Sequence, residues 1–115
     1  MVLKKDKRDF VTEMGAEGGV GKLVLEKVTN SAVAPSNVRL YAHAKLEPGA
    51  SVGYHTHYGE CEIYYILSGK GIYSDNGTKR EVNAGDVTYT PDGEGHSLEN
   101  TGSDLLEFIA FIVED

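Results

Sequence analysis

Two short segments of the 115-residue chain carry three of its four histidines. In the first segment one residue separates His55 from His57, and on an extended strand such alternate side chains point to the same face. Glu62 follows after a short glycine-containing turn, so a β-hairpin can present its carboxylate to both imidazoles. In the second segment His96 follows a Pro-Asp-Gly-Glu-Gly turn, and a strand distant in sequence can supply it as a fourth group. Three imidazoles and one carboxylate predict a metal site.

The residues around these four follow a fixed spacing. The first segment has Gly, five residues, His-x-His, four residues, Glu, six residues and Gly, at positions Gly49, His55, His57, Glu62 and Gly69. The second has Gly, five residues, Pro-x-Gly, two residues, His, three residues and Asn, at positions Gly85, Pro91, Gly93, His96 and Asn100. Glycine and proline each make up only about 5–7 % of ordinary proteins, so chance agreement at every position is rare. The two segments resemble the paired motifs of the cupin superfamily.

This resemblance implies an all-β fold, a small single-domain antiparallel barrel of the double-stranded β-helix or jelly-roll type. It also implies that a divalent metal is held by four side chains: His55, His57, Glu62 and His96. The stretches SVGYHTH and EIYYILSGKGIY are most similar to small type 2 cupins described as oxalate-decarboxylase-like. We expect a single cupin domain over residues 1–115, with an N-terminal arm and early strands in 1–36 and the barrel with both motifs in 37–115.

The clearest alternation of apolar and polar residues lies in residues 37–47. One face of this predicted strand suits a barrel interior, because it carries Val38, Leu40, Ala42, Ala44 and Leu46. The small Ala42 and Ala44 leave interior room for a ligand. His43 falls on the other face with Arg39 and Lys45 and lies outside the spaced motif, so we expect it at the surface or an interface.

Further strands are predicted where turn residues separate apolar runs: residues 22–28, 51–57, 62–67, 71–74, 79–82, 86–90, 96–100 and 104–114. Asn76-Gly77 predicts a tight hairpin, since both residues tolerate positive φ. The charged run at residues 4–9 is interpreted as a solvated tail. The glycine-rich residues 15–22 are interpreted as a turn, because they lack the Gly-Lys-Ser/Thr ending of a phosphate-binding loop.

The last predicted strand contains LLEFIAFIV and is apolar on both faces. One face can fill the barrel, and the other needs a second covering layer. Because monomeric proteins rarely expose a broad apolar patch, we expect a homodimer that shares this surface.

Charge and composition exclude several classes of partner. The formal net charge is −7, so nucleic acid and anionic membranes would be repelled. No apolar run approaches the length of a membrane span. The chain has one cysteine, Cys61, and its N-terminal MVLKKDKRDF lacks the apolar stretch of a secretion signal, so we expect the cytoplasm. By strand alternation Cys61 points away from Glu62, toward the core.

Mixed nitrogen and oxygen ligation without thiolate suits manganese, iron, cobalt, nickel, zinc or copper, and we prefer manganese or iron. Glu60 competes for the carboxylate role because it shares a strand face with Glu62. The family spacing to Gly69 selects Glu62, which leaves Glu60 as a solvated rim residue or an acid/base group. Tyr64 and Tyr89 are candidate hydrogen-bond donors at the metal, or else aromatic residues that fill the barrel.

Our leading hypothesis is a metalloenzyme that acts on a small oxygenated organic acid, either decarboxylase-like or dioxygenase-like. Oxalate decarboxylases place an arginine at the substrate, whereas none of Arg8, Arg39 and Arg80 is expected to face the interior. That shortage also disfavours a sugar-phosphate isomerase. The alternative is a module that binds or senses a metal and a small carboxylate without turnover.

Overall fold

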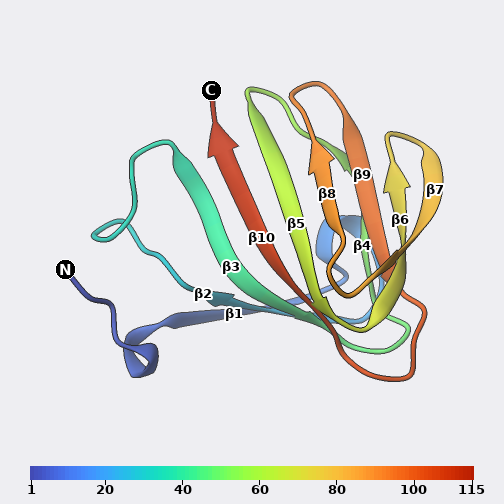
Figure 1. Cartoon of the computed structure of the whole chain (residues 1–115), viewed down its shortest axis with the longest axis horizontal. Helices are drawn as coiled ribbons and strands as arrows, with labels where there is room; N and C mark the ends of the chain where they lie inside the picture. Colours follow the sequence, from blue (N-terminus) through green and yellow to red (C-terminus); the bar gives the residue numbers. More distant parts are fainter.

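The computed structural model describes residues 1–115 and consists almost entirely of strands, as Figure 1 shows. The elements are η1 (Lys5–Lys7), β1 (Asp9–Met14), η2 (Ala16–Gly18), β2 (Lys22–Lys27), β3 (Val38–Leu46), β4 (Ser51–Thr56), β5 (Glu60–Ser68), β6 (Lys70–Asp75), β7 (Thr78–Asn83), β8 (Val87–Thr90), β9 (Gly95–Asn100) and β10 (Leu106–Glu114), where η marks a 3-10 turn. The all-β prediction is confirmed. No helix is long and apolar enough to cross a membrane.

Two antiparallel sheets build the molecule. The larger has the strand order β1-β2-β3-β10-β5-β8, and the smaller has the order β4-β9-β6-β7. Side chains from both sheets meet in one apolar core whose most deeply buried members are Leu46, Ile66, Leu98, Leu106 and Phe108. The functional side chains lie where these two facing layers approach each other.

Alternation along the central strands of the larger sheet separates its two faces. On β3 the predicted inward set is confirmed, with Ala42, Ala44 and Leu46 fully buried. On β10 every second residue from Leu106 to Ile112 is buried. The predicted outward position of His43 is also confirmed, and its Nε2 lies 2.9 Å from Glu107 Oε1. The sheet therefore has one face toward the core and one face toward solvent.

The hairpin at Asn76-Gly77 is confirmed. Asn76 has φ of 50° and Gly77 has φ of 99°, and β6 pairs directly with β7 across this two-residue turn. Positive φ at both positions matches the right-handed twist of the paired strands, which explains the Asn-Gly sequence.

The prediction that β4 and β5 form a hairpin is wrong. β4 pairs with β9 in the smaller sheet, whereas β5 pairs with β10 and β8 in the larger one. The connection crosses between the layers, and the turn before His96 holds it: the His57 N–H donates to the Glu94 carbonyl and the Gly93 N–H donates to the His57 carbonyl. His57 and Glu62 therefore approach each other from facing sheets.

The N-terminal region is more ordered than the sequence suggested. The solvated tail predicted for residues 4–9 contains η1 and leads at Asp9 into β1, which pairs with β2 along its whole length. An ion pair of 2.6 Å between Arg8 and Glu26 ties the start of β1 to β2. The glycine-rich turn was expected, and it contains η2.

Candidate metal centre

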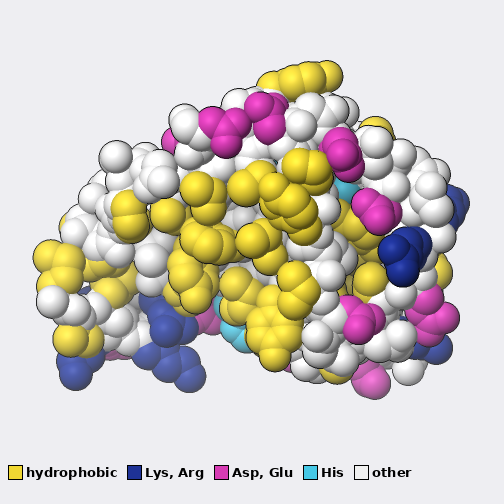
Figure 2. All heavy atoms as spheres, turned by 45° about the horizontal axis from the view of Figure 1, so that its top comes forward, with side chains coloured by type: hydrophobic (Ala, Val, Ile, Leu, Met, Phe, Trp, Pro, Cys, Tyr) yellow, Lys and Arg dark blue, Asp and Glu magenta, His cyan; other side chains and the backbone are white.

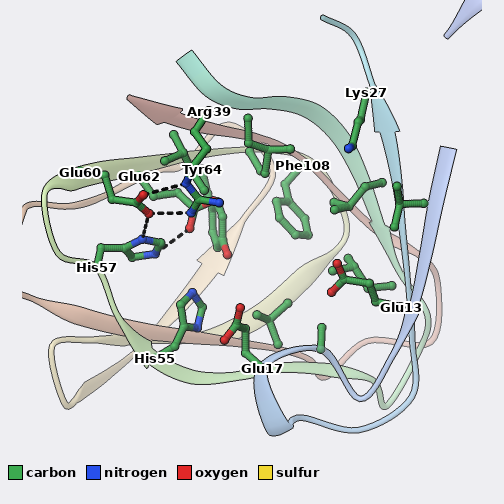
Figure 3. A pocket seen from close by; sticks show the side chains of 18 of the residues that line it. Glu13, Glu17, Lys27, Arg39, His55, His57, Glu60, Glu62, Tyr64 and Phe108 are labelled. Carbon is green, nitrogen blue, oxygen red and sulfur yellow. Dashed lines mark hydrogen bonds and ion pairs between the residues drawn. The ribbon is translucent and has the colours of Figure 1, made fainter. Parts of the chain in front are cut away.

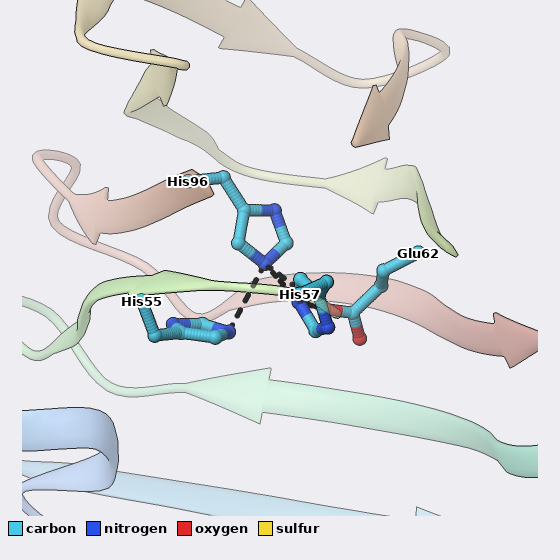
Figure 4. Close-up of side chains that lie close together, drawn as sticks. All are labelled: His55, His57, Glu62 and His96. Carbon is cyan, nitrogen blue, oxygen red and sulfur yellow. Dashed lines mark hydrogen bonds and ion pairs between the residues drawn. The ribbon is translucent and has the colours of Figure 1, made fainter. Parts of the chain in front are cut away.

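Three imidazoles and one carboxylate converge between the two sheets (Figure 4). His55 comes from β4, His57 from the residue just after β4, Glu62 from β5 and His96 from β9. His96 Nε2 lies 3.1 Å from His57 Nε2 and 3.2 Å from His55 Nε2. Glu62 Oε1 lies 3.0 Å from the Nε2 atoms of both His57 and His96. The structure thus gathers the four residues that the motif spacing singled out.

The outward nitrogen of each imidazole has a hydrogen-bond partner. His55 Nδ1 donates to the Gly53 carbonyl at 2.8 Å, and His57 Nδ1 lies 2.6 Å from a Glu60 carboxylate oxygen. A neutral imidazole carries one proton, so a proton held at Nδ1 leaves a lone pair at Nε2. The Nε2 lone pairs of His55 and His57 therefore point into the cluster, toward the carboxylate of Glu62.

Such a cluster requires a positive charge at its centre. Hydrogen bonding to Glu62, opposed by burial and aided by Glu60, raises the pKa of His57. Burial alone would raise the pKa of Glu62, but its bonds to His57 and His96 outweigh that effect and leave the pKa lowered. Both pKa shifts favour a protonated His57 beside an ionised Glu62, because a proton on His57 partly neutralises the negative charges of Glu60 and Glu62. A divalent cation would neutralise these charges fully, and three imidazoles with one carboxylate are a donor set that suits such a cation.

An ion pair at the rim holds His57 in place. Arg39 donates two hydrogen bonds of 2.7 Å, from Nε and Nη2, to the two carboxylate oxygens of Glu60. This bidentate contact, with burial opposing it and His57 helping it, lowers the pKa of Glu60 to about 2. Glu60 therefore stays ionised and orients His57, an arrangement typical of the outer shell of metal-binding histidines.

Arg39 is exposed, as predicted, but it lies at the rim of the cavity. Strand alternation assigns Arg39 to the outer face of β3, yet its side chain lines the rim of the cavity and reaches Glu60 (Figure 3). Arg39 lies next to the irregular pairing of β3 with β10, where the register shifts between Ile112 and Val113. At such an irregularity alternation no longer fixes the direction of a side chain.

Neutral hydroxyl groups support His96 on the opposite side. Its Nδ1 lies 2.9 Å from both Tyr73 Oη and Thr90 Oγ1, and all three side chains are buried. Burial lowers the pKa of His96 despite the opposing effect of Glu62, and burial raises the pKa of Tyr73. Sequence analysis missed Tyr73 and Thr90 as site residues. The one available signal was that strand alternation places both side chains on the buried faces of their strands, β6 and β8.

A cavity of about 540 Å³ opens beside the cluster. His55, His57 and Glu62 line it (Figure 3), whereas His96 is not among the lining residues, so the cluster borders the cavity through three of its four members. Tyr64 also lines the cavity, stacks on His96 with ring centroids 4.9 Å apart, and points its hydroxyl into the space. Burial raises the pKa of Tyr64 well above its usual value, so the phenol remains a hydrogen-bond donor at neutral pH.

Two other candidates lie away from the cluster. Tyr89 occupies the outer face of β8 and is 57 % exposed, so the structure does not bring it to the three histidines. The inward residue at this end of β8 is Thr90 instead. Cys61, expected in the core, is only partly buried on the outer side of β5.

Comparison with known proteins identifies the family. The model of the Cupin domain matches residues 42–112, more than half of the chain. The chain belongs to the cupin family. A curated Oxalate-binding protein from Thermotoga maritima is 48 % identical over 96 residues, which cover 84 % of this cupin and 79 % of that protein.

Two further relatives agree with this assignment. The crystal structure of a predicted oxalate decarboxylase from Thermotoga maritima superposes with a TM-score of 0.93 and 42 % identity over the whole of both chains. Oxalate decarboxylase from Bacillus subtilis is 35 % identical over 100 residues, which cover 83 % of this cupin but only 26 % of that longer enzyme. The relationship to single-domain cupins of the oxalate-decarboxylase type is therefore established.

Proposed function

We propose that this cupin binds a divalent transition metal through His55, His57, Glu62 and His96 and acts as a metalloenzyme on a small oxygenated organic acid. The observation that carries the proposal is the convergence of Nε2 lone pairs and one carboxylate at the edge of a cavity. A bound metal would supply a Lewis acid that polarises a carboxylate or carbonyl oxygen. The reaction we favour is oxalate-decarboxylase-like or dioxygenase-like.

Manganese and iron are the metals we prefer. The donor set contains nitrogen and oxygen only, since Cys61 lies outside the cluster. Cobalt, nickel, zinc and copper also bind imidazole nitrogen, and the donor set alone does not separate them from manganese and iron. On an octahedral ion, four protein ligands would leave two positions for a ligand.

The chain's own residues suit an anionic ligand at this place. Tyr64 directs a protonated phenol into the cavity and can donate to a ligand oxygen. Arg39 lies on the rim with half of its side chain exposed, where its charge is paired with that of Glu60. Glu60 is held in its ionised form by Arg39, so we assign it to orienting His57 rather than to proton transfer. The relatives named for oxalate point to the same ligand class.

Metal analysis and one substitution test the proposal. We expect untagged protein to purify with about one equivalent of a divalent metal, and His96→Ala to lose it. The matched control is His43→Ala, because His43 lies on the outer face and contacts Glu107 instead of the cluster. Manganese- and iron-loaded protein would then be screened against oxalate, 2-oxo acids and diketones for carbon dioxide release or oxygen consumption. Full metal occupancy in His96→Ala would refute the metal assignment.

The second candidate function is a module that binds a small carboxylate at the metal without turnover. The relative that matches 84 % of this chain is named as an oxalate-binding protein, which favours this candidate. A carboxylate that raises the melting temperature in a concentration-dependent way, without any product from the screen, would establish binding alone.

We also propose a homodimer through the outer face of the larger sheet. Cross-strand partners build two apolar rows on this face, Tyr41–Phe111–Ile63–Tyr89 and Ile109–Tyr65–Val87. Figure 2 shows hydrophobic side chains gathered broadly on the face toward the viewer, and Tyr65 and Tyr89 are 47 % and 57 % exposed. Sedimentation should give twice the chain mass of 12.5 kDa. Tyr65→Glu should give the monomer, whereas Val20→Glu, in an exposed loop, should not.

The cytoplasm is the compartment we propose. The single Cys61 is free and cannot form a disulfide within the chain. A fold without a disulfide needs no oxidising compartment. Cell fractionation followed by immunodetection tests this assignment.

A further inference from the structure

The cavity beside the cluster has two chemically different ends. His55, His57, Glu62 and Tyr64 form one end, as Figure 3 shows on its left. Ten of the other sixteen lining residues are hydrophobic, and Glu13, Glu17 and Lys27 are charged groups that line the cavity beside them (Figure 3). A ligand that only contacts the cluster would leave this apolar wall in contact with water.

The apolar wall belongs to the fold and is not an accidental gap. β1 and β2 extend the inner face of the larger sheet, where Val11 pairs with Leu25, and Leu25 in turn pairs with Ala44 on β3. Phe108 and Ala110 continue the same face on β10. On this face the small side chain of Ala110 lines the cavity and leaves space that a larger residue would fill, whereas Ala42 and Ala44 are fully buried and do not line it.

The volume exceeds what a two-carbon acid needs. At roughly 30 Å³ for each water molecule in the liquid, a cavity of about 540 Å³ has room for about 18 waters. Oxalate has only six non-hydrogen atoms, so most of the space would remain filled with water. Cavities of this size and apolar character ordinarily hold ligands with a substantial apolar body.

We infer that the preferred ligand of this cavity is a carboxylic acid with an apolar body of at least three carbons, such as a medium-chain 2-oxo acid, and not oxalate itself. Its acid group lies at the His/Glu cluster, and its hydrocarbon body packs against Val11, Leu25 and Phe108. This inference rests on the proposed function, because the acid group needs the metal-loaded cluster. It adds to that proposal the hydrocarbon body of the ligand, which the cluster does not contact.

A chain-length series tests the inference. The affinities of glyoxylate, pyruvate, 2-oxobutanoate, 2-oxopentanoate and 2-oxohexanoate for metal-loaded protein are measured by anaerobic titration calorimetry, with oxalate as the two-carbon dianion. Burial of each methylene should tighten binding about three- to fourfold. From pyruvate to 2-oxohexanoate the dissociation constant should fall at least tenfold. A smaller fall, or tighter binding of oxalate than of 2-oxohexanoate, would overturn the inference.

A cavity-filling variant locates the effect. Val11→Trp places a large ring at the apolar end, so it should leave pyruvate affinity within twofold and remove the gain with chain length. Thr12→Trp is the matched control, because Thr12 is the next residue on β1, is exposed and does not line the cavity. A full chain-length gain in Val11→Trp would overturn the placement. If Val11→Trp does not fold, the series on the unaltered protein decides alone.

The same series separates this inference from the proposal beneath it. If pyruvate and oxalate bind only to metal-loaded protein and not to His96→Ala, the proposed metal site is supported. This conclusion does not depend on the effect of chain length. If they bind but affinity is flat along the series, only the apolar-body inference fails. If no acid binds to metal-loaded protein, the proposed function fails first.

Discussion

His57 and His96 face each other across the cluster, but opposite kinds of neighbour hold them. At the rim, the charged pair of Glu60 and Arg39 orients His57, and the Arg39 side chain is 50 % exposed. In the interior, two neutral hydroxyls contact His96, which is 1 % exposed. Orientation by charge and orientation by buried hydroxyls thus meet at a single site.

The difference follows from where each support lies. The Glu60 side chain is only 12 % exposed, but the half-exposed Arg39 bonds both of its oxygens, so Glu60 carries its charge despite the cost of burial. At His96 Nδ1 a second ionised group, in addition to Glu62 at Nε2, would be buried without a partner of opposite charge and therefore costly, and neutral hydroxyls occupy that place. We therefore expect the rim support to control metal affinity and pH response, and the interior support to control packing. The predictions below probe this division.

The largest effect is expected from Glu60→Ala. It removes the carboxylate that accepts from His57 Nδ1, which frees the ring and lowers its basicity as a ligand. Loss of such an outer-shell partner typically weakens metal binding about 10- to 100-fold. Competition with a chromophoric chelator at neutral pH measures the change.

Glu99→Ala is the matched control for that measurement, since Glu99 is exposed on β9, three residues from His96. It should bind metal like the unaltered protein. Equal affinities for Glu60→Ala and Glu99→Ala would show that the ion pair at the rim plays no part in holding His57.

A second, smaller effect is expected on acid stability. The ordinary pKa of 4.5 falls to about 2 at Glu60, so its ionised form stabilises the folded state above pH 4.5 and this stability is lost as pH falls toward 2. Because Arg39 is half-exposed, solvent screening reduces the contribution to on the order of 1–2 kcal/mol. Urea unfolding of metal-free protein should show Glu60→Gln less stable at pH 6. The gap should close near pH 2, and a gap independent of pH would contradict the assignment.

The set His55, His57, Glu62 and His96 was predicted because the two segments match the spaced motifs of the cupin superfamily. Alternation along β3 predicted which residues face the core, and the Asn-Gly pair predicted the turn between β6 and β7. The alternation and the turn depend on local geometry alone, so one sequence suffices to find them.

What the sequence could not predict depends on contacts between distant segments. The link from His57 to Glu62 looks like a hairpin, because nothing local shows that β4 and β5 join different sheets. Arg39 escapes alternation at an irregular pairing, and that irregularity exists only once β10 is beside β3. Tyr73 becomes a site residue only because β6 pairs with β9. Residues that hold a metal-binding side chain in place are therefore harder to predict from the sequence than the metal-binding residues themselves.

The smallest effect is expected from Tyr73→Phe. Thr90 Oγ1 also lies 2.9 Å from His96 Nδ1, so one hydroxyl remains when the other is removed. We expect metal affinity to fall only about two- to threefold, as for loss of one replaceable hydrogen bond. Thr90→Val alone should behave alike for the same reason. The double variant leaves Nδ1 buried without a partner, so its loss should exceed the product of the two single losses. A single Tyr73→Phe loss as large as that of Glu60→Ala would reverse the division between rim and interior, because a neutral hydroxyl would then govern affinity as strongly as the charged pair.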